Sequence, residues 1–434
     1  MSELLSGDLP WWAWLLLAMG FTAIVAVVAA LFLPDWHTPE DLSTTCDAEA
    51  GSEAFLGALS RFLNVPLVRG GTAHILQNGD VFFPTMLEAI RAARETINFQ
   101  VYIFEPKGIG VDFLEAFKER ARAGVEVRLM VDAFGSHKLD KRHVRELEEA
   151  GCQVKRFRPI KLLTLVRVFK RDHRRAIVVD GRVGFTGGGA IAEKWTGKAQ
   201  DPHHWRDSML RVEGPLAAAI QTAFGENWVY CAGEIVAGVP FYSGEPEDRA
   251  AEPVGLAVVS SPSDSAQPIR LLFWLSFVAA RERIWISSSY FVPGASIRNA
   301  IKQRARAGVD VRILVPGKNT DAHPVRLAGR GLYQELLEAG VRIFEYEPTM
   351  MHAKTVVVDS RWSVLGSANM DERSTEINEE NSIGVLDRDL AGEIERGLEQ
   401  DMAVSREIDL AAWRRRSLIA RIGERAASLL MQQY

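Results

Sequence analysis

Residues 116–131 read AFKERARAGVEVRLMV, and residues 300–315 read AIKQRARAGVDVRILV. The two stretches are identical at 11 of 16 positions and lie 184 residues apart, which indicates an internal duplication. In each copy a helical pattern ends at a glycine, Gly124 or Gly308, and an alternating β-branched stretch follows. The repeat therefore predicts two α/β lobes, each with a helix that leads into a strand.

Further strand-like runs flank both copies of the repeat. Apolar patterns predict strands at 97–104, 125–131 and 154–157 in the first half, and at 284–289, 309–315 and 341–346 in the second. Between the halves, residues 243–253 read SGEPEDRAAEP, and this run of turn formers and charges predicts a linker. We therefore expect a first lobe at 52–242 and a second lobe at 254–405.

The composition of the 434-residue chain limits its class. With 47% hydrophobic and 25% charged residues, it is typical of a folded protein with at least two domains. A net charge of −5 opposes a dedicated nucleic-acid binder, which needs a broadly basic surface. The 3 cysteines are odd in number and widely spaced, so they predict neither a disulfide framework nor a metal site. The sequence leaves the oligomeric state open.

The N-terminal region contains a long apolar run. Residues 11–33 carry no charge, and a bilayer-spanning helix needs about 20 such residues. Tryptophans, which favour the membrane–water interface, stand near both ends of the run at Trp11, Trp12, Trp14 and Trp36. The preceding tail has acidic but no basic residues, unlike a cleaved signal peptide. We therefore expect residues 1–40 to form an uncleaved transmembrane anchor with the bulk of the chain in the cytoplasm.

Each half of the chain carries one copy of a second motif, in which a histidine, any residue, a base and four further residues precede an aspartate. The first copy runs from His173 to Asp180 and the second from His352 to Asp359. Side chains two positions apart on a strand share a face, so each histidine should project beside its base, Arg175 or Lys354. A two-fold arrangement of the lobes would bring the two histidines together.

A hairpin follows each motif. The chain turns after the aspartate and returns as a strand that ends in small residues, Gly188 in the first half and Ser367 in the second. Small residues let a ligand approach the backbone closely. Asp180 and Asp359 themselves precede a turn, so we expect them to cap the turn rather than to take part in catalysis.

The doubled motif resembles that of the phospholipase D (PLD) superfamily and, within it, of the bacterial cardiolipin synthases. The similarity runs from about residue 71 to residue 405, with supporting stretches WRD at 205–207, YEPTMMH at 346–352 and GSANMDER at 366–373. This resemblance implies two duplicated α/β lobes, each with a mixed β-sheet flanked by helices, packed face to face around one active site.

The resemblance also implies roles for individual residues. His173 would attack a phosphodiester and His352 would protonate the departing alcohol, while Arg175 and Lys354 stabilise charge on the phosphoryl oxygens. In the family a downstream carboxylate orients each histidine, and the matching residue is Asp207 for His173 and Glu380 for His352. The remaining residues expected at the substrate phosphate are Asn369, Ser367 and Gly188. No metal or cofactor is required.

Two positions depart from the family pattern. Arg175 stands where the family usually has lysine, and Gly189-Ala190 stands where an asparagine is common at the second position. Arginine keeps the positive charge and can hold a phosphate through two N–H groups, but its planar group is not geometrically equivalent to an ammonium.

Two segments are candidates for contact with lipid. In residues 155–175, basic residues surround an apolar patch whose leucines, Leu162, Leu163 and Leu165, could enter the acyl region. Residues 406–434 predict a basic amphipathic helix, for which packing against the protein core is an equal alternative.

The sequence favours an enzyme of the bacterial inner membrane that transfers a phosphatidyl group between two phosphatidylglycerol molecules, giving cardiolipin and glycerol. A phospholipase D-type hydrolase, or a transferase with another acceptor, is the first alternative. A nuclease and a non-catalytic membrane scaffold are further alternatives, and the net charge and the apolar N-terminal run oppose the nuclease.

Overall fold

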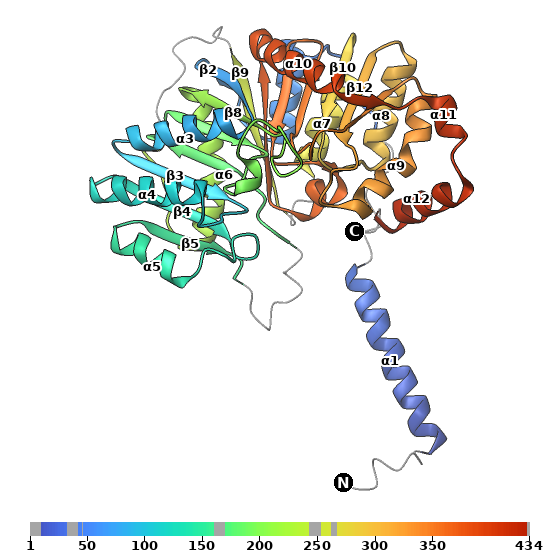
Figure 1. The fold of residues 1–434 in the computed structure, drawn as a ribbon, viewed down its shortest axis with the longest axis horizontal. Coiled ribbons are helices and arrows are strands. Elements are labelled where there is room, and N and C mark those ends of the chain that lie inside the picture. The colour runs from blue at the N-terminus through green and yellow to red at the C-terminus, as the bar shows by residue number, and fades with distance from the viewer. Residues whose placement is uncertain are drawn as a thin grey trace.

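The computed structural model describes residues 10–32, 42–45, 47–159, 170–242, 253–261 and 267–431. Two α/β lobes lie side by side, each built on a mixed β-sheet with helices against it, as the duplication predicts (Figure 1). Nearly all of the predicted linker at 243–253, and the leucines at 162, 163 and 165, fall outside the described residues.

The first lobe contains a seven-stranded sheet with the strand order β2-β8-β7-β6-β3-β4-β5. Strands β3, β4 and β5 are parallel and the other pairings are antiparallel. The strands are β2 (Thr72–Gln77), β3 (Thr96–Val101), β4 (Glu126–Asp132), β5 (Gln153–Phe157), β6 (Ala176–Val179), β7 (Val183–Gly187) and β8 (Ser208–Glu213). Helices α3 (Gly79–Ala92), α4 (Ile109–Arg122) and α5 (Lys141–Glu149) share an apolar core with one face of this sheet, and α6 (Pro215–Ala232) packs on the other.

The second lobe contains a nine-stranded sheet with the order β1-β9-β17-β15-β14-β10-β12-β13-β18. Its strands are β1 (Val68–Arg69), β9 (Val254–Ser260), β10 (Arg283–Ser287), β12 (Asp310–Pro316), β13 (Arg342–Tyr346), β14 (Thr355–Val358), β15 (Trp362–Gly366), β17 (Glu380–Leu386) and β18 (Ser405–Glu407). A separate pair joins β11 (Phe291–Val292) to β16 (Met370–Asp371). The helices of this lobe include α2 (Glu53–Leu63), α7 (Pro268–Val278), α8 (Ala295–Arg306), α9 (His323–Glu338) and α10 (Arg388–Ala403).

The predicted strands and both hairpins are confirmed, with shifts of a few residues at most at their ends. The carboxylate of Asp180 accepts hydrogen bonds from backbone N–H groups of residues 94–96, at 2.8 to 3.2 Å. Asp359 accepts the matching bonds from residues 281–283, at 2.8 to 2.9 Å. Each aspartate thus fixes the turn that starts the central strand, β3 or β10, in agreement with a structural role.

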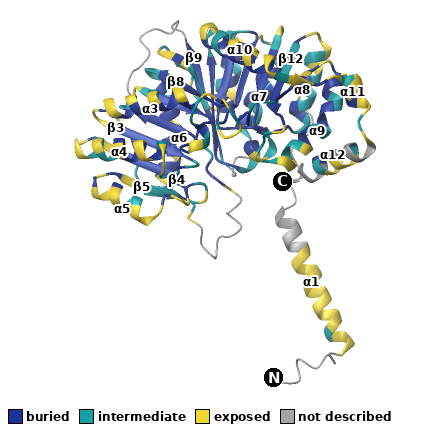
Figure 2. Cartoon of the chain, viewed as in Figure 1, coloured by how far each residue is buried: buried dark blue, intermediate teal, exposed yellow. Residues whose placement is uncertain are grey.

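One apolar cluster joins the two lobes. It contains Val178 and Val212 of the first sheet, Val357 and Leu365 of the second, and side chains of α6 and α10. Figure 2 shows buried residues running through both sheets and across the seam between the lobes. The two sheets therefore form a single body, and whatever lies at the seam is held by both.

The prediction that the first lobe begins at residue 52 is wrong, because the segment at 53–69 belongs to the second lobe. Helix α2 packs against α7, and β1 pairs with β9, so residues 53–69 complete the sheet and core of the second lobe. The buried Phe55 lies edge-on to Trp362 with ring centroids 5.2 Å apart. The helix has a clear apolar face, but a local pattern does not say which distant sheet that face covers.

The single C-terminal helix predicted at 406–434 is also wrong. Strand β18 extends the second sheet to Glu407, and two helices follow, α11 (Leu410–Arg414) and α12 (Leu418–Met431). Asp409 caps the first of these by accepting from the backbone N–H of Ala412 at 2.7 Å. Helix α12 packs on α9, and Glu424 accepts from Arg330 at 2.9 Å. The described part of this segment thus packs on the core.

Helix α1 (Trp11–Phe32) covers most of the predicted anchor and stands apart from the two lobes (Figure 1). Its tryptophans at positions 11, 12 and 14 are all more than half exposed. Within the described residues, no helix meets both the length and the hydropathy that crossing a bilayer requires.

The placement of α2 in the second lobe can be tested by truncating one side chain. We expect Phe55→Ala to lower the free energy of unfolding by about 3–5 kcal/mol, because it opens a cavity against Trp362. The matched control is Phe62→Ala in the same helix, whose side chain is 69% exposed and whose loss should change stability little. Denaturant unfolding measures both, and equal effects of the two variants would contradict the placement.

Candidate active site

The two histidine motifs lie at the seam, where backbone hydrogen bonds cross from one lobe to the other. The N–H of His173 donates to the carbonyl of Glu379 at 2.8 Å, and the N–H of His352 donates to the carbonyl of Arg206 at 2.7 Å. Bonds also run back, from Glu379 N–H to the Arg171 carbonyl and from Arg206 N–H to the Met350 carbonyl, both at 2.9 Å. Each motif is therefore bridged to the residue that precedes a carboxylate of the opposite lobe.

His352 is held by Asp207 from the first lobe. Its Nδ1 lies 2.6 Å from Asp207 Oδ2, and the indole N–H of Trp195 donates to the same oxygen at 2.8 Å. The backbone N–H of Ser208 donates to the other carboxylate oxygen at 2.7 Å. The sequence pattern paired Asp207 with His173 of its own half, and this pairing is wrong because the crossed bridges exchange the carboxylates between the lobes.

His173 lies beside Glu380 from the second lobe, so the carboxylate expected at His352 is found at His173. Its Nδ1 is 3.5 Å from Glu380 Oε1, which is longer than the contact at His352. The hydroxyl of Ser367 donates to Glu380 Oε2 at 2.5 Å, and the ring of Tyr102 lies 4.0 Å from the His173 ring. Glu380 therefore holds the His173 imidazole less closely than Asp207 holds that of His352, and the Tyr102 ring packs against the His173 ring.

The two predicted cations occupy matching places. Arg175 Nη1 donates to the carbonyl of His173 at 2.5 Å, and Lys354 Nζ donates to the carbonyl of His352 at 2.6 Å. Lys354 also donates to the hydroxyl of Ser289 at 2.6 Å. Both side chains are almost completely buried, so each positive charge lies in a low-dielectric setting where a phosphate would be strongly attracted.

Burial and charge set the protonation states of the site. Burial, followed by the nearby cations, lowers the pKa of His173 well below its ordinary value and that of His352 to about 4. Burial also lowers the pKa of Lys354 to about 8 and raises that of Glu380 to about 8. Burial favours a raised pKa for Asp207 as well, but His352 and Lys354 outweigh it and the pKa is lowered. At neutral pH both imidazoles are neutral, as a nucleophile requires.

The three residues expected at the substrate phosphate, Gly188, Ser367 and Asn369, differ in their contacts. A Cβ on Gly188 would meet Asp207 Oδ1 at 2.2 Å, so a glycine is needed there to make room for the carboxylate. Ser367, which has the position in the second half that Gly188 has in the first, contacts Glu380. Asn369 is buried, and its Oδ1 has no hydrogen-bond partner within the described residues. In the same part of the chain, His, Cys, Asp and Glu side chains form no group of three that could hold a metal ion.

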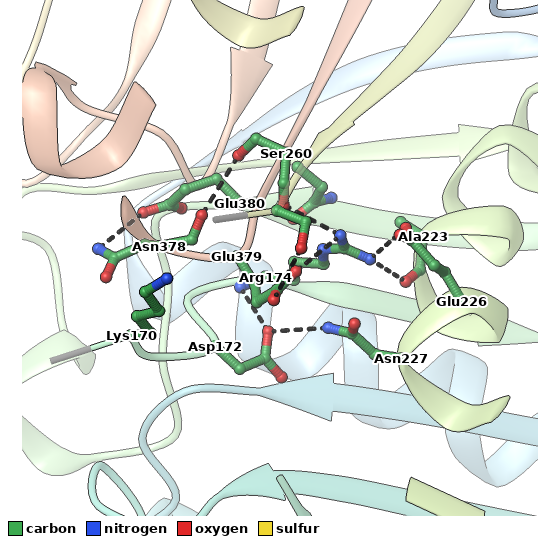
Figure 3. Close-up of polar contacts among 12 residues, drawn as sticks. Lys170, Asp172, Arg174, Ala223, Glu226, Asn227, Ser260, Asn378, Glu379 and Glu380 are labelled. Carbon is green, nitrogen blue, oxygen red and sulfur yellow. Dashed lines mark hydrogen bonds and ion pairs between the residues drawn. The ribbon is translucent and has the colours of Figure 1, made fainter. Parts of the chain in front are cut away.

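A buried ionic network that the sequence motifs did not predict is centred on Arg174, the residue that follows His173 (Figure 3). Arg174 donates to Glu226 at 2.8 Å, to Glu379 at 3.1 Å and to the carbonyl of Ser260 at 3.1 Å. Its partners place this fully buried side chain against α6 and the second lobe. The network joins the first motif to the second lobe, which no local sequence signal indicates.

Comparisons with known proteins agree with this architecture. Residues 86–228 and 276–402 match the family described as cardiolipin synthase, PLD-like domain. Cardiolipin synthase A of Pseudomonas fluorescens (strain SBW25) is 35% identical over 379 residues, which cover 87% of this chain and 78% of that protein. Cardiolipin synthase 2 of Bacillus anthracis is 33% identical over 356 residues, covering 82% of this chain and 69% of the relative.

Among solved structures, the phosphatidylserine synthase of Haemophilus influenzae Rd KW20 superposes with a TM-score of 0.68 at 13% identity, covering 88% of this chain and 99% of that chain. This likeness concerns the fold alone. The two lobes and the doubled histidine motif at their seam define a phosphatidyltransferase of the PLD-like class. Within that class, the chain belongs to the cardiolipin synthase family.

The raised pKa of Glu380 predicts a pH-dependent effect on stability. The folded protein keeps the Glu380 proton up to a pH of about 8, whereas the ordinary pKa is 4.5. Stability from this proton is complete below the ordinary value and is lost as pH rises through the folded value. Glu380→Gln keeps a neutral side chain at every pH and so does not lose this stability. The free energy of unfolding of the variant, minus that of wild type, should therefore be larger near pH 8 than near pH 5 by about 1 kcal/mol or more, which is roughly 2–4 °C in Tm.

Thermal unfolding of both proteins at the two pH values measures this gain. The exposed Glu148→Gln serves as the control, since its side chain lies on the surface of α5 and should show no such difference. A Glu380→Gln effect of the same size at both pH values would contradict a protonated Glu380.

Proposed function

We propose that this enzyme transfers the phosphatidyl group of one phosphatidylglycerol to the headgroup hydroxyl of a second, releasing glycerol and forming cardiolipin. The observation that carries the proposal is the pair of neutral imidazoles that each lie beside a buried cation, His173 with Arg175 and His352 with Lys354. Membership of the cardiolipin synthase family supports the substrate class.

In the first half-reaction, His173 attacks the phosphorus of the donor lipid. A nitrogen–phosphorus bond forms, the bond from phosphorus to the glycerol oxygen breaks, and His352 gives a proton to that oxygen. Arg175 and Lys354 stabilise the charge on the non-bridging oxygens, and the amide of Asn369 provides a further contact. Asp207 and Glu380 orient the imidazoles through Nδ1.

The protonation of His352 depends on the substrate. Nearby cations contribute to the low pKa of His352. An anionic phosphodiester between the cations offsets them and raises the pKa of His352, so that the imidazole can carry the proton it donates. In the second half-reaction the hydroxyl of the acceptor gives its proton to His352 and attacks the phosphorus, and the bond to His173 breaks.

Labelled phosphatidylglycerol as the only lipid tests the reaction, which should give cardiolipin and glycerol in equal amounts. Phosphatidic acid as the main product would contradict the proposal and favour a hydrolase. With an activated nitrophenyl phosphodiester lipid, whose leaving group departs without an acid, we expect His352→Ala to accumulate an acid-labile phosphoryl adduct on His173, because the base for the second half-reaction is missing. His173→Ala should form no adduct. Mass spectrometry of rapidly quenched protein locates the label, and an adduct on His352 in the His173→Ala protein would reverse the two roles.

We also propose that residues 1–40 anchor the enzyme in the bacterial inner membrane, with the lobes on the cytoplasmic side. The uncharged run at 11–33 and the exposed tryptophans of α1 support this proposal. Removing residues 1–40 should release most of the folded protein from membranes. The remainder should bind through the basic segment at 155–175, and this binding should fall with salt because the Debye length is about 10 Å at 0.1 M. Unchanged membrane binding of the shortened protein would contradict the anchor.

A further inference from the structure

The Lys194 side chain lies against two tryptophans beside the active site. Its ammonium is 3.8 Å from the centre of the Trp205 ring and 4.7 Å from that of the Trp195 ring. The side chain is partly buried, and burial lowers its pKa. Across the described ranges, Lys194 forms no ion pair with a carboxylate, so its ammonium contacts the two aromatic faces while the charges of Asp321 and Glu105 act on it from farther away.

The same two tryptophans contact His352. The Trp205 and Trp195 rings lie 5.1 and 5.3 Å from the His352 ring, and Trp195 donates to Asp207, the carboxylate that holds His352. A single side chain, Trp205, therefore contacts both the Lys194 ammonium and the His352 ring. The Asp321 carboxylate acts electrostatically on both Lys194 and Lys354, which places the two ammonium groups around one region.

The duplication supports this placement. Counting from the end of each hairpin, Glu193-Lys194 in the first half matches Glu372-Arg373 in the second. The charge of Arg373 acts on His173, just as Lys194 lies beside the tryptophans that contact His352. Each lobe thus places a second cation at the same position beyond its histidine motif.

The two carboxylates whose charges act on Lys194, Asp321 and Glu105, form no ion pair with it in the described part of the chain and have other partners. Glu105 already binds Lys138 at 2.7 Å and Lys107 at 3.4 Å. Asp321 accepts a hydrogen bond from the hydroxyl of Tyr290 at 2.9 Å. A partly desolvated ammonium without a paired carboxylate gains more from an incoming anion than a fully hydrated surface lysine does.

The second half-reaction needs such a cation. The acceptor lipid carries its own anionic phosphodiester, one glycerol unit away from the hydroxyl that attacks. At this stage Arg175 and Lys354 are occupied by the phosphoryl group on His173, and the attacking hydroxyl lies at His352. The acceptor phosphodiester must therefore lie a short distance beyond His352, where Lys194 is the nearby cation among the groups described above.

We propose that Lys194 binds the phosphodiester of the acceptor lipid and so selects an anionic lipid acceptor over water and neutral alcohols. This inference rests on the proposed function. It assigns Lys194 to acceptor binding and gives it no part in forming the phosphohistidine.

A competition between two acceptors tests the assignment, because both products come from one phosphohistidine. The full-length enzyme is given phosphatidylglycerol vesicles with ethanol, and the ratio of cardiolipin to phosphatidylethanol is measured by mass spectrometry. Lys194→Gln should lower this ratio about tenfold, the size expected for one charged hydrogen bond. Lys194→Arg should retain most of the ratio, and Lys198→Gln, at an exposed lysine in the same loop, should leave it unchanged.

The ratio separates acceptor binding from a structural role. If Lys194 only stabilised the fold or the donor site, Lys194→Gln would lower both products equally, and an unchanged ratio would overturn the inference. A wild-type enzyme that makes phosphatidylethanol but no cardiolipin would instead overturn the proposed function, before any variant is compared.

Discussion

The crossed backbone bridges between the lobes are the constraint on which the active site depends. Residue 173 is bridged to residue 379 and residue 352 to residue 206, while the carboxylates follow one position later, at 380 and 207. A histidine and its carboxylate therefore always come from different lobes. Neither lobe alone can assemble an oriented imidazole, so the two lobes act as one catalytic unit.

Buried ion pairs of opposite polarity reinforce the two bridges. Arg206 of the first lobe binds Asp401 of α10, and Glu379 of the second lobe binds Arg174. In each pair the charge lies one residue before the carboxylate that contacts a histidine, Asp207 or Glu380, but its sign is reversed between the halves. Removing one partner of a buried pair typically costs about 3–5 kcal/mol, because the other charge is left uncompensated. Each half of the chain thus has an inter-lobe ion pair at this position, formed by different residues in the two halves.

The repeat made the strands, the hairpins and both histidine motifs predictable, because these are local patterns that occur twice. The exchange of Asp207 and Glu380 could not be read in this way, since a spacing of 34 or 28 residues says nothing about which lobe a side chain faces. The positions of α2 and of the tryptophans around His352 also depend on distant contacts. Gly188 shows the same limit, because its small size was predictable but its reason, the space taken by Asp207, was not.

The charges at the seam favour the binding of an anion. Two cations are buried beside two neutral imidazoles, and burial holds Glu380 in its protonated form at neutral pH, so the site carries positive charge that its own residues do not balance. Burial lowers the pKa of Lys354 to about 8, which means that its ammonium form is costly until an anion arrives. Binding of a phosphodiester relieves this cost and makes a proton on His352 easier to hold. In the proposed mechanism the substrate thus supplies the charge that turns His352 into an acid, and departure of the alcohol leaves the same imidazole neutral and ready to accept a proton from the next hydroxyl.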